Sequence, residues 1–182
     1  MVKTFFKNLL VILLILSFLI TLTNFYYALM YPLKYNSIIV SEASANQLDA
    51  DFVCAVIAVE SRFDKFATSE SGAIGLMQLM PTTAIQMAVE VGLENFTVED
   101  LYDEKINIRL GTKYLRYLKN KFFNVRTMLA AYNAGEGVVM EWLFDPLISP
   151  DGVSIGYTPY KETNAYIDEV LEVLKIYRNK RY

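Results

Sequence analysis

The sequence predicts a mainly α-helical protein in which one apolar N-terminal helix precedes a helical domain. Three observations lead to this prediction. An uncharged, apolar run occupies residues 9–30. Beyond it, apolar residues recur almost throughout at the three- and four-residue spacing of helices. No segment combines alternating apolar and polar residues with a hairpin turn, so we expect little or no β-sheet.

The run from Leu9 to Met30 has the length of a membrane-spanning helix. It extends about 33 Å at 1.5 Å per residue, which is enough to cross the hydrocarbon core of a bilayer. Lys3 and Lys7 precede it, and this positive charge predicts a cytoplasmic N-terminus with the rest of the chain exported. We therefore expect residues 1–32 to form a single-pass anchor in the cell membrane. Residues 33–182 are expected to form one domain on the extracytoplasmic side.

A cleaved signal peptide is the alternative, because a charged start and an apolar core fit both kinds of segment. The stretch after the core offers Tyr, Leu and Met where a cleavage site needs small residues. The small-residue sequence Ala43-Ser44-Ala45 lies too far downstream. We favour the uncleaved anchor.

The exported part is expected to be a series of helices. Asp49 or Asp51 caps the first, which covers residues 52–61. Pro81 begins the second helix and Gly92 ends it. The apolar periodicity predicts further helices over residues 106–120, 127–133, 138–144 and 162–177. Three prolines and two glycines between residues 145 and 159 predict an irregular loop.

Composition excludes several kinds of chemistry. The chain has 182 residues, 17 basic and 20 acidic side chains, no histidine, and Cys54 as its one cysteine. A net charge of −3 argues against a general nucleic-acid binder. Histidine-dependent catalysis, zinc sites built from His and Cys, and an internal disulfide are excluded. We expect neither a metal nor an organic cofactor.

Glu60 is the first candidate for acid–base chemistry. Val53, Val56 and Ile57 lie seven, four and three residues before it, so its carboxyl group ends an apolar stripe. It also stands in the last turn of its helix, where the helix dipole disfavours negative charge. Both effects raise the pKa of a carboxyl group, as a general acid requires near neutral pH. The alternatives are an ordinary exposed acid at a helix end, or an opposite effect from an inward-pointing Arg62.

Two further segments stand out. In Ser71–Pro81, Gln78 is surrounded by apolar residues, and its amide must find partners if it is buried. An N-acetyl group is a fitting ligand, and hydrogen bonds to backbone are the alternative. In Ala130–Gly135, small residues surround Tyr132, whose hydroxyl also needs a partner if it is buried. A core tyrosine before a helix end is the alternative there.

Taken together, these segments give the chain a resemblance to a known family. It resembles the family 1 lytic transglycosylases, the catalytic domain of the soluble lytic murein transglycosylase type, which is related to goose-type lysozyme. The resemblance covers about residues 41–177. It rests on five blocks in the same order, namely Glu60-Ser61 with Phe63, Ala67 and Ser69; GAIGLMQLMP with Thr83-Ala84; Asn107-Ile108-Arg109-Leu110-Gly111 with Tyr114-Leu115; AAYNAG with Gly137, Val138 and Trp142; and Glu162-Thr163 with Tyr166. Glu104 departs from the family pattern, in which a proline often precedes the third block.

The resemblance implies a lysozyme-like helical fold and the site residues of a peptidoglycan-cleaving lyase. Glu60 matches the single catalytic acid/base of the family. Tyr132 matches the tyrosine that hydrogen-bonds the catalytic carboxyl group, and Asn133 lies beside it. Three other positions match residues that line the sugar-binding cleft, namely Ser69, Met77 and Gln78. Arg109 and the Glu162-Thr163 pair match motif positions that we interpret as structural.

The implied reaction is cleavage of the β-1,4 bond between N-acetylmuramic acid and N-acetylglucosamine in glycan strands, with 1,6-anhydromuramoyl products. Glycosidases generally use two carboxylates, whereas here the 6-hydroxyl group of the sugar itself would be the nucleophile. Two alternatives remain open: a lysozyme-like muramidase that uses water, and a non-catalytic module that binds peptidoglycan.

Overall fold

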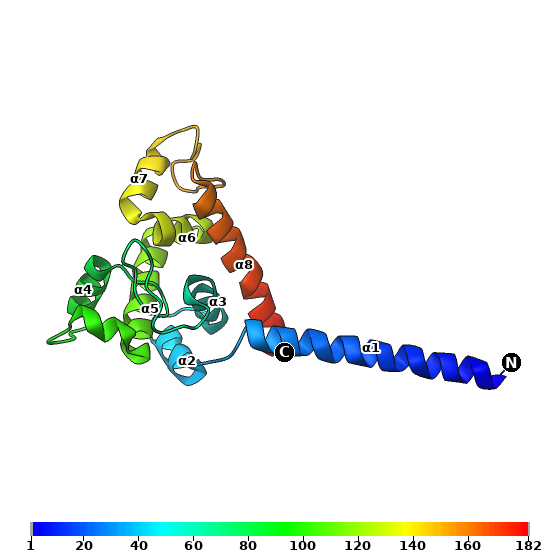
Figure 1. The fold of residues 1–182 in the computed structure, drawn as a ribbon. Coiled ribbons are helices and arrows are strands. Elements are labelled where there is room, and N and C mark those ends of the chain that lie inside the picture. Colours follow the sequence, from blue (N-terminus) through cyan, green and yellow to red (C-terminus); the bar gives the residue numbers. More distant parts are fainter. Residues whose placement is uncertain (1, 182) are drawn as a thin grey trace. The chain divides into compact units, whose positions relative to one another are not determined.

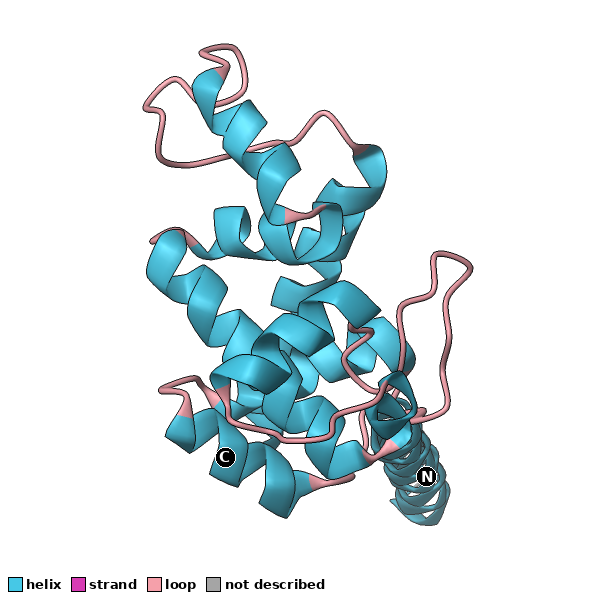
Figure 2. Cartoon of the chain, turned by 90° about the vertical axis from the view of Figure 1, so that its left-hand side faces the viewer, coloured by secondary structure: helices cyan, strands magenta, loops and turns pink. Residues whose placement is uncertain are grey.

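The computed structural model describes residues 2–181, and their helices confirm the predicted fold class. Within this range no β-strand is present, and only two isolated bridges occur, Thr68 with Ile74 and Ile74 with Leu79 (Figure 2). Contacts divide the chain into two compact units, Met1–Leu33 and Lys34–Tyr182.

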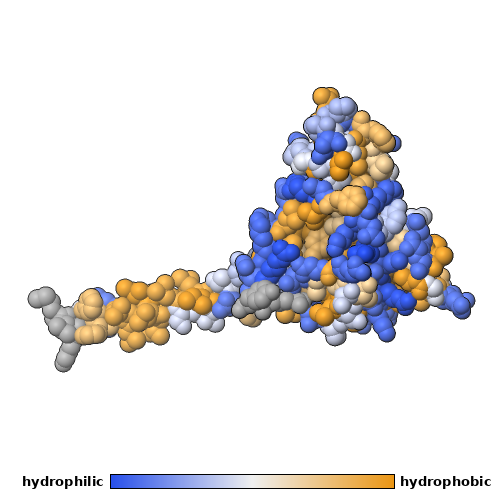
Figure 3. All heavy atoms as spheres, turned by 180° about the vertical axis from the view of Figure 1, so that it is seen from behind, coloured by the Kyte–Doolittle hydropathy of each residue, from blue (hydrophilic) through white to orange (hydrophobic). Residues whose placement is uncertain are grey.

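The first unit consists largely of one long helix, α1 (Val2–Met30). Its segment Thr4–Met30 is long and apolar enough to cross a membrane, and its apolar window is entirely unburied. Apolar side chains cover much of the face of this helix that the space-filling view shows, whereas polar and apolar surface alternate on the visible face of the second unit (Figure 3). A helix that is apolar on all sides requires an apolar environment around it.

The second unit contains the other helices (Figure 1). They are α2 (Asn36–Ala45), α3 (Ala50–Ser61), α4 (Pro81–Glu90), the 3-10 helix η1 (Val98–Tyr102), α5 (Glu104–Lys121), α6 (Val125–Ala134), α7 (Glu136–Phe144) and α8 (Lys161–Arg181). The predicted loop between residues 145 and 159 contains no helix or strand.

Caps explain where several helices begin, and most begin one or two residues before the predicted position. The Asp49 carboxylate accepts a hydrogen bond from the Asp51 backbone N–H and starts α3, and Pro81 is the first residue of α4. Asn124 and Asp103 cap α6 and α5 in the same way. Two helical elements are absent from the prediction. The α2 helix follows Tyr35, which provides no side-chain cap, and η1 begins with a capping box between Thr97 and Asp100.

The core is formed around α3, which packs against α8 along much of its length. Between its two ends, α3 contributes an almost continuous buried stretch from Phe52 to Ala58. From α8, the buried side chains of Val170 and Tyr177 face this core. The ring of Tyr177 lies 6.5 Å from the ring of Phe63, the second residue after α3. Because α3 is buried for most of its length, its C-terminal end is the place where a polar side chain meets the edge of the core.

Candidate active site

Glu60 lies in the last turn of α3 and is half-buried. Burial raises the pKa of its carboxyl group to about 7, and the Tyr166 hydroxyl acts in the opposite direction. Arg62 is exposed and is not among the causes of this shift, so the opposing effect considered from the sequence does not arise. A carboxyl group with a pKa of about 7 is half protonated near neutral pH and can donate a proton there.

The Tyr166 hydroxyl interacts with the Glu60 carboxyl group. From the sequence, Tyr166 is named only as part of the family pattern and is given no role in the site. It is located on α8, is almost completely buried, and makes no regular hydrogen bond to another described residue. Its hydroxyl nevertheless lies close enough to lower the pKa of Glu60. Burial and the nearby Glu60 charge in turn raise the pKa of Tyr166 well above its usual value. The O–H of Tyr166 is therefore available to stabilise a carboxylate at Glu60.

Tyr132 has a different partner from the one that the resemblance implied. Its hydroxyl donates a 2.7 Å hydrogen bond to the backbone carbonyl of Met77, and not to the Glu60 carboxyl group. Burial raises the pKa of Tyr132, and the Glu60 charge adds to this effect, so the two side chains are electrostatic neighbours. Tyr132 thus holds the loop that follows α3 against α6, beside Glu60.

Met77 is fully buried, so the prediction that it lines the sugar-binding cleft is wrong. Its side chain packs on Gly111 of α5, where an added Cβ atom would overlap with it. Its backbone N–H donates a 2.8 Å hydrogen bond to the Asn107 side-chain oxygen. Met77 supports the wall of the cleft from behind and does not line it.

The side-chain amide of Gln78 donates hydrogen bonds to backbone carbonyls, which is the alternative to binding of an N-acetyl group that was considered from the sequence. Its Nε2 donates to the carbonyls of Gly75 (3.0 Å) and Ala67 (3.2 Å). Its backbone adopts a φ of 45°, a conformation that residues other than glycine seldom adopt. Ser69 is half-buried, and its hydroxyl oxygen accepts a hydrogen bond from the Ala73 N–H. The loop is therefore held in one shape by its own hydrogen bonds.

A pocket of about 200 Å³ is lined in part by three of the predicted residues, Gln78, Tyr132 and Asn133. Glu60 is not among the lining residues, and Tyr132, which interacts electrostatically with Glu60, relates the acid to the pocket. The pocket also contains side chains that the sequence did not single out as site residues, from α4, α5 and the loop before α4, namely Leu79, Met80, Thr83 and Tyr114. Tyr114 stacks obliquely on Tyr132, with 5.4 Å between ring centroids. Tyr132 therefore belongs both to the lining of the pocket and to the surroundings of the Glu60 carboxyl group.

The remaining motif residues have structural contacts. The Asn133 side-chain oxygen accepts a 2.8 Å hydrogen bond from the Thr163 hydroxyl, which connects α6 to the first turn of α8. Arg109 donates to the carbonyl of Val91, consistent with the structural role expected for it. Among the residues that the structure describes, no three His, Cys, Asp or Glu side chains lie close enough together to hold a metal ion.

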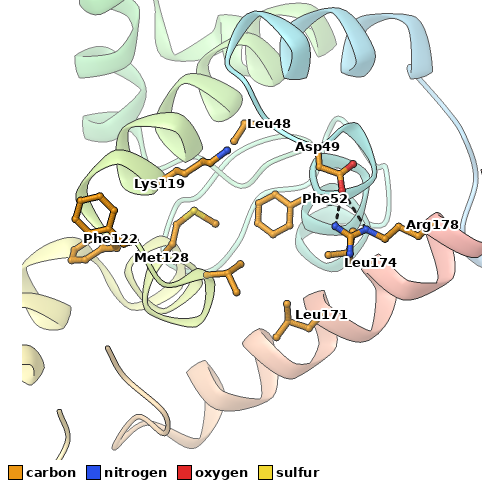
Figure 4. A pocket seen from close by; sticks show the side chains of 11 residues that line it. Leu48, Asp49, Phe52, Lys119, Phe122, Met128, Leu171, Leu174 and Arg178 are labelled. Atoms are coloured by element: carbon orange, nitrogen blue, oxygen red, sulfur yellow. Dashed lines mark hydrogen bonds and ion pairs between the residues drawn. The ribbon is translucent and has the colours of Figure 1, made fainter. Parts of the chain in front are cut away.

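A second, apolar groove of about 410 Å³ lies at a different place, between the start of α3, the turn from α5 to α6, and the second half of α8 (Figure 4). Its side chains include Leu48, Phe52, Phe122, Met128, Leu171 and Leu174. Arg178 pairs with Asp49 at its edge, 2.8 Å apart. No motif residue from the sequence lines this groove, and it lacks an acid with a raised pKa.

Comparisons with known proteins agree with the fold and with the resemblance. Residues 37–146 match the family described as the Transglycosylase SLT domain. The soluble lytic murein transglycosylase of Escherichia coli K12 is 34% identical over 151 residues, which cover 81% of this chain and 23% of that protein. Membrane-bound lytic murein transglycosylase E of Buchnera aphidicola is 33% identical over 95 residues, 51% of this chain and 43% of that protein.

Solved structures give the same result. Lytic transglycosylase Slt of Pseudomonas aeruginosa, solved as an inactive mutant, superposes with a TM-score of 0.74 at 32% identity and covers 85% of this chain and 25% of that one. The 70 kDa soluble lytic transglycosylase of Escherichia coli gives a TM-score of 0.71 at 31% identity, over 83% of this chain and 25% of that one. The chain thus spans about a quarter of the length of these soluble relatives. By its match over most of its length and by its fold, this chain belongs to the transglycosylase SLT domain family.

Proposed function

We propose that residues 33–182 form a lytic transglycosylase domain that cleaves the β-1,4 bond between N-acetylmuramic acid and N-acetylglucosamine in peptidoglycan. The single observation that carries the proposal is the half-buried Glu60 carboxyl group, whose pKa of about 7 suits a general acid and which interacts electrostatically with Tyr132 of the pocket. The curated relatives are named lytic murein transglycosylases, which supports this substrate.

The proposed reaction uses one carboxyl group twice. Protonated Glu60 gives its proton to the glycosidic oxygen as the bond from this oxygen to the anomeric carbon breaks. The 2-acetamido group of the muramoyl sugar stabilises the positive charge that develops. The Glu60 carboxylate then takes the proton of the 6-hydroxyl group on the same sugar, and this oxygen bonds to the anomeric carbon. The products are a 1,6-anhydromuramoyl end and a free 4-hydroxyl group, and water is not consumed.

Features around Glu60 support this use of a single acid. Its pKa is set by burial and Tyr166, and no second carboxylate is among the causes, whereas two acids acting together would influence each other. The Tyr166 hydroxyl is suited to stabilise the carboxylate that forms after the first proton transfer, because it makes no other regular hydrogen bond. The closing step is intramolecular, which gives it a large entropic advantage.

The proposed binding residues are those that line the pocket or its rim. We include Gln78, Tyr132 and Asn133 from the sequence, and add Met80, Thr83 and Tyr114. Ser69 lies on the loop held by Gln78 and stays in the proposal with its hydroxyl proton available to a ligand. Met77 is omitted because its side chain has no exposed surface.

We further propose that α1 anchors the domain as a single-pass helix, with the domain on the extracytoplasmic side of the cell membrane. The segment Thr4–Met30 is apolar enough to cross a membrane, and Lys3 and Lys7 lie near the N-terminal end of the helix. Some relatives are named membrane-bound lytic transglycosylases, which supports a location at the membrane.

The test is mass spectrometry of the muropeptides that the purified protein releases from peptidoglycan. The proposal expects 1,6-anhydromuramoyl ends, and Glu60→Gln should release none above background while it still folds. Reducing muramic acid ends would instead identify a water-using muramidase. Binding of peptidoglycan without release of any product by the parent protein would identify a non-catalytic module.

A further inference from the structure

Phe66 is an exposed aromatic side chain on the loop between α3 and α4. Its side chain is 67% exposed. The ring of Tyr102 lies beside it, with 6.2 Å between centroids, and the Lys65 ammonium group lies 5.3 Å from the centre of the Phe66 ring. Two aromatic rings and an adjacent lysine are the kind of side chains that concentrate where proteins meet the headgroup region of a membrane.

The backbone around Phe66 is fixed, so the exposure of this ring is built into the fold. The Phe66 N–H donates a 2.9 Å hydrogen bond to the Asp64 carboxylate. The carbonyl of the next residue, Ala67, accepts hydrogen bonds from the Gly75 N–H and from Gln78. The Thr68 and Tyr102 hydroxyl groups are 3.0 Å apart and form a hydrogen bond. Phe66 is therefore presented to solvent by an ordered loop.

This loop lies next to the residue at which the domain is attached to α1. Five residues separate Met30, the end of α1, from Asn36, the start of α2. A chain of this length spans at most about 20 Å between those two residues. Tyr35 is the last residue of the connection. The pKa of Lys65 is raised mainly by its hydrogen bond to Glu104, and Tyr35 contributes electrostatically, so Tyr35 is within electrostatic range of Lys65.

The charge around Phe66 points to the interface of a bilayer and not to a strongly anionic partner. Lys65 is paired with Glu104 at 2.8 Å, and Asp103 also acts on Lys65. Asp64 is exposed on the same loop. The acids therefore balance the local lysine, and binding must come from the aromatic rings. A short tether provides a high effective concentration of bilayer, so a weak contact of this kind is sufficient.

We propose that Phe66 and Tyr102, with Lys65 beside them, form a docking surface for the lipid bilayer to which α1 anchors the chain. The inference rests on the proposed anchoring and goes beyond it, because it determines which face of the domain turns toward the membrane. The loop that docks is also the loop whose Ala67 carbonyl is bonded by Gln78 of the pocket. Docking would therefore fix the direction of the cleft with respect to the membrane.

The experiment uses the full chain in phosphatidylcholine vesicles, with and without brominated acyl chains that quench nearby tryptophan. Three separate variants introduce one tryptophan each at an exposed phenylalanine: Phe18→Trp in α1, Phe66→Trp in the loop, and Phe123→Trp. Phe123 is the matched control because it is 89% exposed and borders the apolar groove of Figure 4. The native Trp142, 7% exposed, provides the same background in every protein.

We expect bromination to reduce the fluorescence of the Phe18→Trp and Phe66→Trp proteins below that of the parent, while the Phe123→Trp protein behaves like the parent. If bromination reduces the fluorescence of the Phe18→Trp protein but not that of the Phe66→Trp protein, the proposed docking surface is wrong and the proposed anchor stands. No loss at position 18 would overturn the anchoring itself. Equal losses at positions 66 and 123, or a loss at 123 alone, would overturn the choice of this face.

Discussion

The Tyr132 hydroxyl donates its hydrogen bond to the Met77 carbonyl, at 2.7 Å, across 55 residues of sequence. This bond fastens the loop after α3 to α6 next to Glu60. We expect Tyr132→Phe to lower the free energy of unfolding by about 1–3 kcal/mol, because it leaves a buried carbonyl without its donor. Denaturant titration would measure the change, and an unchanged midpoint would show that the bond contributes nothing.

Tyr166→Phe should behave in the opposite way, although both tyrosines adjoin Glu60. The Tyr166 hydroxyl is buried without a regular hydrogen bond, so its removal should leave the free energy of unfolding unchanged or slightly higher at pH 5, where Glu60 is protonated. Because this hydroxyl lowers the pKa of Glu60, the variant should have a higher Glu60 pKa. The alkaline limb of its pH–rate profile should therefore move to higher pH. An alkaline limb at the same pH in variant and parent would contradict an effect of Tyr166 on the pKa of Glu60.

The pH dependence of the parent enzyme follows from the same carboxyl group. Glu60 must be protonated to donate to the glycosidic oxygen, and its pKa is about 7. We expect kcat/KM for peptidoglycan turnover to fall about tenfold per pH unit above pH 7. The rate of release of anhydromuropeptides between pH 5 and pH 9 checks this. A rate that keeps rising through pH 8 would contradict protonated Glu60 as the active form.

Glu60→Gln should stabilise the protein at alkaline pH. The folded-state pKa is above the ordinary value of 4.5, so between these two values the folded state binds more protons and stability falls as pH rises. Above pH 7 the parent carries the full cost of a half-buried charge, up to about 3 kcal/mol, which the amide avoids. The difference in the free energy of unfolding between variant and parent should be largest at pH 8 and shrink toward pH 4.5. A constant difference across this range would contradict the shifted pKa.

Asn107 determines the shape of the loop behind the pocket. Its amide bonds the Met77 N–H and the carbonyls of Ile74 and Leu101, and its side chain is completely buried. Asn107→Ala should cost about 3–5 kcal/mol in unfolding free energy, because three buried backbone groups lose their partner. Asn120→Ala, an exposed change on the same helix, is the control and should cost less than about 0.5 kcal/mol. Equal effects of the two substitutions would contradict this role.

Local sequence was sufficient to predict most of the helices, because capping residues and apolar periodicity act over a few residues. It also predicted the raised pKa of Glu60, whose cause is burial at the end of an apolar helix, whereas the predicted effect of the helix dipole is not among the causes. The α2 helix was missed since no side chain caps its start. A helix start that has a capping side chain can therefore be predicted from a few neighbouring residues, but a helix without such a cap can be missed.

The site contacts required information from distant parts of the chain. The interaction of Tyr166 with Glu60 joins positions separated by 106 residues, and a spacing pattern within α8 indicates burial but not the partner. Met77 and Gln78 are adjacent, yet one is fully buried and the other lines the pocket. Which of the two faces the pocket is decided by packing of Met77 on Gly111 of α5 and by the backbone conformation at Gln78.

The five residues from Tyr31 to Tyr35 have a consequence for where such an enzyme works. With α1 anchored in a bilayer as proposed, the domain would extend outward by little more than its own size, so only the innermost glycan strands of the wall would lie within its reach. Lateral diffusion of the protein in the bilayer would then supply fresh substrate. Cuts made in this way would accumulate along the inner surface of the wall and spare its outer layers.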